Sequence, residues 1–449
     1  MRRRRKKFDI YLVIFLSIIV IAYFAYNNIS SESRGIEAYQ SALKYYKDFD
    51  YEKAYKEFGK VPSGSTLKHS ALFRQARSAT NLGKKELAVK KYNKIVHSNS
   101  KSSIVPISEY NMANLLLDID DSKAKKHFKN IIKKHPTSDY AIASEYFLGL
   151  IAIDNLPENP KKLKKAKEQA LINFKTYIQK APGGRYSIKS IDEIMKLGLP
   201  LKNYDNLLIA KSYYANGDYE QVQSFLNKTT LAESWTDFAK NEYQLGNIDK
   251  TRYYTNYGLK DHADAFESKE IYTIIDNYIA TYPSRKEGIT SLVNAGYKST
   301  GADYIAYLNC NEVVSSSYKE ACFRTLYETY PNGQFSAESL YNIFITKYLQ
   351  KKYYDAQRLG FLHLKKFPDV KSSPAITYYM GRIANKLKHY ESANNYYKQT
   401  IAKFPDSYYA YRANCNLYKD DGAFPFTESF SSSNIFLTYA RDASSFSAR

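Results

Sequence analysis

Histidine and cysteine, which serve most often as metal ligands and activated nucleophiles, are sparse in this 449-residue chain, with seven and three residues. It contains no HExxH pair, no Gly-rich phosphate loop and no GxSxG elbow, the spacings that bring such residues together. The histidines stand among basic residues, and we expect them to be solvated or to cap helices. They include His97, His127, His135, His363 and His389. We therefore expect no metal site and no cofactor.

The cysteines show no metal or redox spacing either. The three, Cys310, Cys322 and Cys415, include no CxxC pair and no histidine at zinc spacing. A Cys310–Cys322 bridge could form in an oxidising compartment. An odd number argues against a disulfide framework and favours unpaired buried thiols, so the sequence leaves the pairing open.

Charge and aromatic content point to surfaces rather than to a catalytic centre. The net charge is +21, of which residues 1–9 contribute +5, leaving +16 on the body. A basic body attracts polyanions, but the simpler interpretation is a solvated, lysine-rich helical surface. Many of the 45 tyrosines occur in pairs such as Tyr378-Tyr379. A helical repeat can bury one ring of a pair and leave the other near a groove, where rings stack on sugars or peptides.

The clearest structural unit runs from Pro374 to Tyr418. Small residues at Gly381 and Ala393 recur with large ones such as Tyr397, and Pro405 stops the second helix. The pattern predicts a helix, a short turn and a second antiparallel helix, with small residues where the helices touch. These positions fall at the offsets of the 34-residue tetratricopeptide pattern.

The same unit recurs upstream. Ala54, Ala88 and Ala124 lie 34 and 36 residues apart in predicted second helices. No period-2 strand pattern persists. We therefore predict an all-α, TPR-like solenoid, a superhelix of helical hairpins with a concave groove. The residues predicted to pack the repeats are Ala54, Phe58, Ala88, Tyr92, Ala124, Phe128, Trp235, Ala356, Gly381, Ala393, Tyr397 and Pro405.

The N-terminus predicts a membrane anchor ahead of the solenoid. A basic cluster precedes residues 10–26, seventeen residues without a charge, which as a helix reach roughly 26 Å. The flanking charge places the N-terminus in the cytoplasm and the body outside. A cleaved signal peptide is the alternative, but the run ends in bulky residues and favours an uncleaved anchor. We expect a single-pass protein of the bacterial inner (plasma) membrane with a periplasmic or extracellular body.

The expected organisation has six parts, with a boundary at the Pro182-Gly183-Gly184 break. Residues 263–334 look helical but lack a clean repeat signature. The parts are a cytoplasmic basic tail (1–9), the transmembrane anchor (10–26), a linker (27–35), a TPR-like array (36–182), a second helical-repeat superhelix (187–418) and a C-terminal segment (419–449).

Residues 376–413 resemble the superhelical region of soluble lytic murein transglycosylases. The motifs are Tyr-Met-Gly-Arg-Ile-Ala at 379–384 and Phe-Pro-Asp-Ser-Tyr-Tyr-Ala-Tyr-Arg-Ala at 404–413. Residues 436–446, FLTYARDASSF, are similar to the first catalytic helix of that family. The resemblance implies that Ala443 stands where the family has its catalytic glutamate. Alanine cannot donate a proton, and the chain ends before the rest of that domain, so we expect no glycan cleavage. A fragment or a frameshift past Tyr418 would give a similar ending.

Three functions fit these observations. The first is a non-catalytic, anchored scaffold that binds envelope proteins or peptidoglycan. The second is a lytic murein transglycosylase that is truncated here, and the third is an anchored chaperone for secreted proteins. The membrane contact would be made through residues 10–26. Nucleic acid is a poor candidate partner, because this topology places the basic body outside the cytoplasm.

Overall fold

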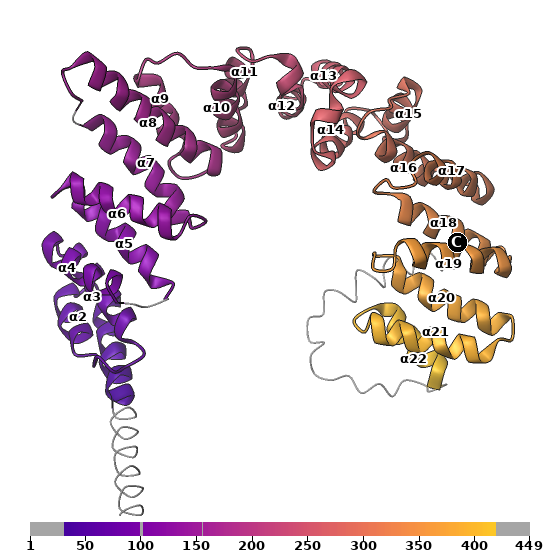
Figure 1. Cartoon of the computed structure of the whole chain (residues 1–449), viewed down its shortest axis with the longest axis horizontal. Helices are drawn as coiled ribbons and strands as arrows, with labels where there is room; N and C mark the ends of the chain where they lie inside the picture. The colour runs from indigo at the N-terminus through magenta and orange to yellow at the C-terminus, as the bar shows by residue number, and fades with distance from the viewer. Residues whose placement is uncertain (1–30, 99–101, 155, 419–449) are drawn as a thin grey trace, which may run out of the picture. The chain divides into compact units, whose positions relative to one another are not determined.

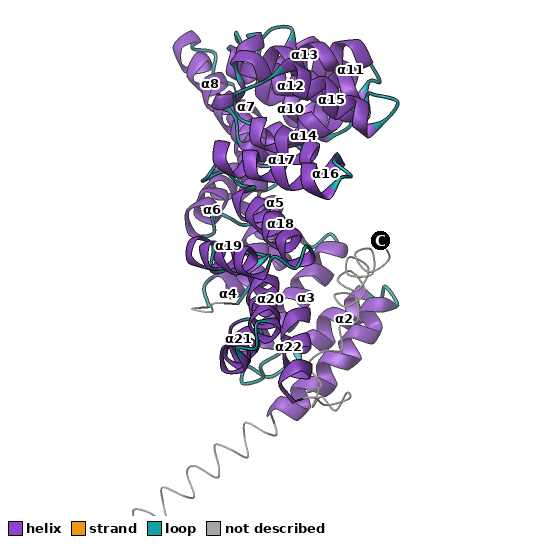
Figure 2. Ribbon diagram, turned by 90° about the vertical axis from the view of Figure 1, so that its right-hand side faces the viewer, coloured by secondary structure: helices purple, strands orange, loops and turns teal. Residues whose placement is uncertain are grey.

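The computed structural model describes residues 31–98, 102–154 and 156–418. In these ranges the chain forms helices joined by short turns and contains no strand (Figures 1 and 2). This agrees with the all-α, helical-repeat part of the predicted fold. Contacts between helices divide the chain into two units, Met1–Thr230 (unit 1) and Leu231–Arg449 (unit 2). The boundary expected after Pro182 falls inside unit 1, at the turn between two of its helices.

The membrane part of the predicted fold class needs correction. None of the helices within residues 31–98, 102–154 and 156–418 combines the length and the apolar character that crossing a bilayer requires. Within these ranges the fold is an all-α solenoid in which no helix qualifies as a membrane span, so the anchored fold class is corrected to an all-α solenoid, and the single-pass location in an inner membrane is corrected with it. The predicted anchor itself, residues 10–26, lies outside the described residues.

Unit 1 is a run of helical hairpins, coloured indigo to magenta in Figure 1. It begins with a helix over residues 31–47. The helices that follow are α2 (Tyr51–Gly59), α3 (Lys68–Asn81), α4 (Lys85–Val96), α5 (Ile104–Leu116), α6 (Asp121–Lys134), α7 (Asp139–Asp154), α8 (Pro160–Lys180), α9 (Ser187–Lys196), α10 (Asn203–Ala215) and α11 (Tyr219–Leu226).

Unit 2 continues with helices of similar length. They are α12 (Leu231–Gln244), α13 (Ile248–Asp261), the short η1 (Ala263–Ala265), α14 (Ser268–Ala280), α15 (Arg285–Ala295), α16 (Ala302–Glu312), α17 (Ser316–Thr329), α18 (Ser336–Leu349), α19 (Tyr353–Lys366), α20 (Ser373–Lys386), α21 (Tyr390–Lys403) and α22 (Tyr408–Tyr418). The stretch 263–334, which lacks a repeat signature in sequence, is thus helical as well.

Local sequence sets where these helices start and stop. The side chains of Asp50 and Asp120 each accept a 3.0 Å hydrogen bond from a first-turn backbone N–H, of Lys53 and Lys123 respectively. Such caps satisfy donors that have no partner within the helix. At the other end, α21 stops at Lys403, two residues before Pro405, because a proline cannot continue the helix.

The two helices of a hairpin approach closely where a small residue faces a large ring. A Cβ added to Gly381 on α20 would lie 2.6 Å from a ring carbon of Tyr397 on α21. The same arrangement occurs in unit 1, where a Cβ on Gly149 would lie 2.6 Å from a ring carbon of Phe174. Contacts this short are excluded, so glycine at these positions lets the aromatic ring fill the space between the helices.

Most residues predicted to pack the repeats are buried. Phe58, Phe128, Trp235 and Tyr397 are among the largest fully buried side chains. The smaller members Ala54, Ala88, Ala124, Ala356, Gly381 and Ala393 are buried too, as is Tyr92, whereas Pro405 is exposed after the end of α21.

Stacking places the first helices of successive hairpins side by side. In unit 1, α3 contacts α5 and α5 contacts α7, while α4 and α6 each pack between the first helices before and after them. In unit 2, α20 likewise contacts α22. We call the surfaces formed by α3, α5 and α7 and by α20 and α22 the first-helix faces of the two units.

Candidate functional site

The first-helix face of unit 1 contains a pocket of about 290 Å³. Polar side chains from α3 and α5 surround it, and we call it the amide pocket. Arg77, Thr80 and Asn81 are exposed at its rim, whereas Asn111 and Asn114 are partly buried. Its lining residues are Arg77, Thr80, Asn81, Tyr92, Asn111, Asn114 and Leu115.

Tyr92 from α4 also lines the amide pocket. Burial raises the pKa of Tyr92 to about 12, although hydrogen bonds with Thr80 and Asn111 act in the opposite direction. The phenol therefore stays neutral at physiological pH. Asn114 Nδ2 donates to the carbonyl oxygen of Tyr110 at 3.1 Å. The pocket thus offers neutral donors and acceptors with one guanidinium, Arg77, at its edge.

The first-helix face of unit 2 has a different chemistry. On α20, Arg382 Nη1 donates to the hydroxyl of Tyr378 at 3.2 Å. On α22, Arg412 Nη1 donates to the hydroxyl of Tyr408 at 2.9 Å, and Asn416 Nδ2 donates to the Tyr378 hydroxyl at 3.2 Å. We call these five residues the Tyr–Arg cluster.

Each guanidinium of this cluster contacts a tyrosine hydroxyl, Arg382 that of Tyr378 and Arg412 that of Tyr408. Burial is the largest single effect on the pKa of Arg412 and lowers it, but the hydrogen-bond and electrostatic contributions of Tyr408 and Tyr378 together outweigh it, so the net shift is upward. The pKa of Arg382 is raised in the same way, because its hydrogen bond with Tyr378 and the nearby tyrosine hydroxyls together outweigh burial. Both side chains are partly buried. Among the residues that the structure describes, neither forms an ion pair with a carboxylate.

Aromatic rings flank the Tyr–Arg cluster. The ring centroids of Tyr348 and Tyr379 lie 4.8 Å apart, and those of Tyr379 and Tyr409 lie 6.2 Å apart. These three rings are partly exposed, whereas Tyr378 is only 2 % exposed. The pair Tyr378-Tyr379 is therefore divided as the sequence predicts, with one ring in the core and the other at the surface.

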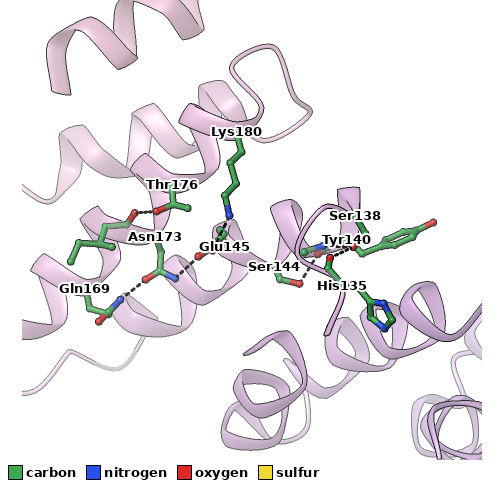
Figure 3. A network of polar contacts seen from close by, with 11 residues as sticks. His135, Ser138, Tyr140, Ser144, Glu145, Gln169, Asn173, Thr176 and Lys180 are labelled. Atoms are coloured by element: carbon green, nitrogen blue, oxygen red, sulfur yellow. Dashed lines mark hydrogen bonds and ion pairs between the residues drawn. The ribbon is translucent and has the colours of Figure 1, made fainter. Parts of the chain in front are cut away.

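A polar network between α7 and α8 is the third candidate, and Figure 3 shows it. Asn173 Nδ2 donates to Glu145 Oε2 at 3.2 Å, Gln169 Nε2 donates to Asn173 Oδ1 at 2.7 Å, and Lys180 Nζ lies 3.8 Å from Glu145 Oε1. Burial raises the pKa of Glu145, which Lys180 and Asn173 partly offset. These contacts link the side chains of α7 to those of α8.

The histidines depart in part from the prediction. His97 and His135 cap the ends of α4 and α6, and His389 precedes α21, as expected. His127 instead pairs with the buried carboxylate of Glu109, with 3.0 Å between Nδ1 and Oε1. His363 is fully buried on α19, where Nε2 lies 2.9 Å from the Ser372 hydroxyl. Packing, rather than solvation, decides the environment of these two.

The cysteines differ from the favoured prediction of unpaired thiols. Cys310 on α16 and Cys322 on α17 form a disulfide, with their Cα atoms 5.5 Å apart, and Cys415 is free. The antiparallel packing of two short helices brings these positions together, which the count of cysteines could not show. In the described ranges, no group of three or more His, Cys, Asp or Glu side chains could hold a metal ion.

Lysines gather on the second helices of unit 1. In α4, α6 and α8 seventeen lysines accompany three acidic residues, and the six lysines of α6 are all exposed. This fits the predicted solvated, lysine-rich surface. The basic charge of unit 1 therefore lies mainly on the second helices, away from the amide pocket.

Sequence reasoning missed both first-helix sites. The signal for the Tyr–Arg cluster is a repeated Tyr-Tyr-x-x-Arg, at 378–382 and again at 408–412. Residues four apart share a helix face, so the repetition places two arginines on the same side of successive first helices. Ala443, which occupies the glutamate position implied by the transglycosylase resemblance, lies outside the described residues.

Comparison with known families identifies the repeat. The tetratricopeptide-repeat family matches residues 70–102, 108–138 and 376–407. The first two segments cover α3 to α6 and the third covers α20 and α21, so the chain contains tetratricopeptide repeats in both units. These matches give no support to the resemblance to lytic transglycosylases. A search of curated proteins found no match.

Several solved structures have low similarity to this chain. The P58(IPK) TPR domain is 16% identical, with 86% of this chain and 97% of that chain covered and a TM-score of 0.27. The APC/C hetero-tetramer Cut9-Hcn1 is 14% identical, with 86% of this chain and 84% of that chain covered and a TM-score of 0.29. Naa15/Naa10 bound to HypK-THB is 15% identical, with 85% of this chain and 65% of that chain covered and a TM-score of 0.25.

Proposed function

We propose that this chain is a protein–protein interaction scaffold that binds extended peptide segments of partner proteins on its first-helix faces. The observation that carries the proposal is the row of amide side chains Asn81, Asn111 and Asn114 around the amide pocket. An asparagine side chain offers both an acceptor and two donors. Such a row matches the alternating N–H and C=O groups of an extended backbone.

The repeat architecture supports this role. Stacked hairpins expose long, shallow surfaces rather than one enclosed cavity, and the amide pocket is open and polar. No pair of groups on it has the geometry of a nucleophile and its base. Binding of a partner is therefore the function that the arrangement suits.

The finer sequence-based hypotheses stay predictions. That the partner is an envelope protein or peptidoglycan, that the chain is a truncated transglycosylase, or that it is a chaperone for secreted chains, rests on sequence patterns alone. Partly exposed rings such as Tyr348 and Tyr379 would suit sugars as well as peptides. A soluble chitooligosaccharide, added as competitor in the experiment below, separates the two: displacement of bound peptide would favour a glycan.

Peptide selection on the immobilised full-length chain tests the proposal. Peptides enriched from a displayed library are then measured on wild type, on Asn81→Ala/Asn111→Ala and on the control Asn93→Ala. Asn93 is an exposed asparagine on the second helix α4. For peptides bound at unit 1 we expect losses on the order of tenfold in the double variant and none in the control. The proposal is overturned if no peptide is enriched, or if substitutions on neither first-helix face change binding.

A further inference from the structure

The Tyr–Arg cluster of unit 2 concentrates positive charge without a counter-charge. Arg382 and Arg412 come from successive first helices and both contact tyrosine hydroxyls. Neither is paired with a carboxylate among the described residues, although unit 2 pairs other cations, such as Arg324 and Lys347 with Glu320. The hydroxyls that these guanidiniums contact are neutral, so the two positive charges are solvated by the cluster but not neutralised within it.

The hydrogen-bond inventory of Tyr378 points the same way. Its hydroxyl oxygen accepts from Arg382 Nη1 and Asn416 Nδ2, each at 3.2 Å. A phenol also has one O–H proton to donate. Within the described part of the chain every neighbour bonded to this hydroxyl is a donor, so the proton has no acceptor. Tyr378 is 2 % exposed, which makes an unmet donor costly.

We propose that the Tyr–Arg cluster is a binding site for an oxyanion, the carboxylate or phosphate of an acidic residue in a bound peptide. The anion would accept hydrogen bonds from the Tyr378 hydroxyl and from both guanidiniums. Arginine suits this task, because its planar fork binds two anion oxygens at once. The inference rests on the proposed function in that the occupant is a peptide.

The surroundings favour a peptide over a free anion. The cluster spans α20 and α22, two adjacent first helices, so it lies on the face where an extended segment would run. Tyr348, Tyr379 and Tyr409 present partly exposed rings beside it, and such rings contact side chains that flank an acidic residue at low entropic cost. The cluster thus selects an acidic residue within a peptide whose neighbours contact aromatic rings.

A direct binding measurement on the full-length chain tests this site. The probe is a short fluorescein-labelled peptide of Gly, Ser and Leu with one central Glu, and its partners carry phosphoserine or Gln at that position. We expect the Glu or the phosphoserine peptide to bind on the order of tenfold more tightly than the Gln peptide. The better of these two arms identifies the anion as carboxylate or phosphate.

Three variants locate the preference. Arg382→Gln/Arg412→Gln should abolish it, and Tyr378→Phe, which changes neither charge nor packing volume, should reduce it several-fold. The matched control is Arg358→Gln/Lys398→Gln, which removes the same charge from two exposed side chains on the second helices α19 and α21. The control should keep the preference. Circular dichroism at 222 nm checks that each variant is folded.

The outcomes separate the two proposals. Equal binding of all three peptides to wild type, or an acidic preference that survives in both Arg382→Gln/Arg412→Gln and Tyr378→Phe, overturns the oxyanion site and leaves peptide binding intact. If the matched control loses the preference for acidic peptides to the same extent, net charge alone explains the preference, and the site is overturned as well. Absence of binding by any peptide here, together with no enrichment in the library selection, overturns both proposals.

Discussion

The amide pocket of unit 1 and the Tyr–Arg cluster of unit 2 lie at corresponding places on similar hairpins. Counted from the start of each family match, Tyr378 and Arg382 correspond to Tyr110 and Asn114. Asn114 is short and folds back onto the carbonyl of Tyr110 in its own helix. Arg382 is long enough to reach the hydroxyl of Tyr378. At this one repeat position, unit 1 therefore has a neutral amide where unit 2 has a guanidinium.

This comparison separates what the repeat fixes from what it leaves free. In both units a glycine faces a large ring, Gly149 with Phe174 and Gly381 with Tyr397, and the hairpin closes over that contact. The outer positions of the first helices carry no such constraint. The repeats can therefore differ in the partners they select while keeping one mode of packing.

The largest expected effect tests the shared packing. Phe128 in unit 1 and Tyr397 in unit 2 are fully buried in second helices. Substitution of either by alanine should cost about 3–5 kcal/mol of local stability, because a cavity remains. Hydrogen exchange of the α6 and α21 amides measures that cost, and Phe361→Ala, at a ring that is 53% exposed, should change little. If the loss of local stability in one unit were less than half the loss in the other, the two units would not share the same packing.

The next effect concerns the disulfide of unit 2. The Cys310–Cys322 disulfide joins α16 to α17 across a separation of 12 residues. Closing a loop of this size stabilises by about 3 kcal/mol in the chain-entropy account. Reduction, or Cys322→Ser, should therefore speed hydrogen exchange in α16 and α17, while α5 and α6 of unit 1 serve as the internal control. Unchanged exchange in α16 and α17 would show that the bridge is not a stabilising element.

A pH effect should also distinguish unit 2. Burial lowers the pKa of His363 from 6.5 to about 4. The unfolded chain then binds a proton at a higher pH than the folded chain does, so stability is full above pH 6.5 and falls as the pH drops toward 4. Between pH 7 and 5 we expect a loss on the order of 2 kcal/mol.

Two variants assign that pH effect. His363→Gln should flatten the dependence measured by urea unfolding, since the buried ring no longer titrates. His389→Gln, at an exposed histidine, should leave it as in wild type. If His363→Gln and wild type lost the same stability on acidification, His363 would not be the cause of the pH dependence.

The smallest expected effect exchanges the chemistry of the two faces. Asn114→Arg places a guanidinium on the first-helix face of unit 1, and Arg382→Asn removes one from unit 2. With the labelled Glu and Gln peptides, Arg382→Asn should lower the acidic preference several-fold, and Asn114→Arg should raise it by a similar factor. The gain should shrink with added salt, because exposed charges are screened. No change in either variant would mean that the repeat position does not set selectivity.

The sequence predicts the scaffold well where the repeat is regular. The spacing of Ala54, Ala88 and Ala124 indicates the hairpins of unit 1, and prolines after the second helices indicate where they end. Between residues 263 and 334 the helices exist without the small-residue signature. There the disulfide and aromatic contacts such as Tyr307 with Phe335, 4.4 Å between centroids, take over part of the packing, and a repeat pattern cannot reveal them.

The sites were harder to predict than the scaffold. Arg382 lies in the motif at 379–384 that resembles the transglycosylases, a resemblance that the comparisons do not support, and Tyr378 is predicted only as one ring of a tyrosine pair. What makes them a site is the convergence of side chains from α20 and α22, thirty residues apart in the chain, and that is a property of stacking. The amide pocket likewise forms only when α3 and α5 come together.

Site-specific photo-crosslinking tests the central claim, that partners bind on the first-helix faces. A photoreactive phenylalanine analogue is placed at Leu115 or Tyr379 on first helices, and at Asn93 or Lys398 on second helices. With peptides selected on the full-length chain, we predict crosslinks from positions 115 and 379 and only background from 93 and 398. Crosslinks that arise from the second-helix positions, with none from the first-helix positions, would contradict the account.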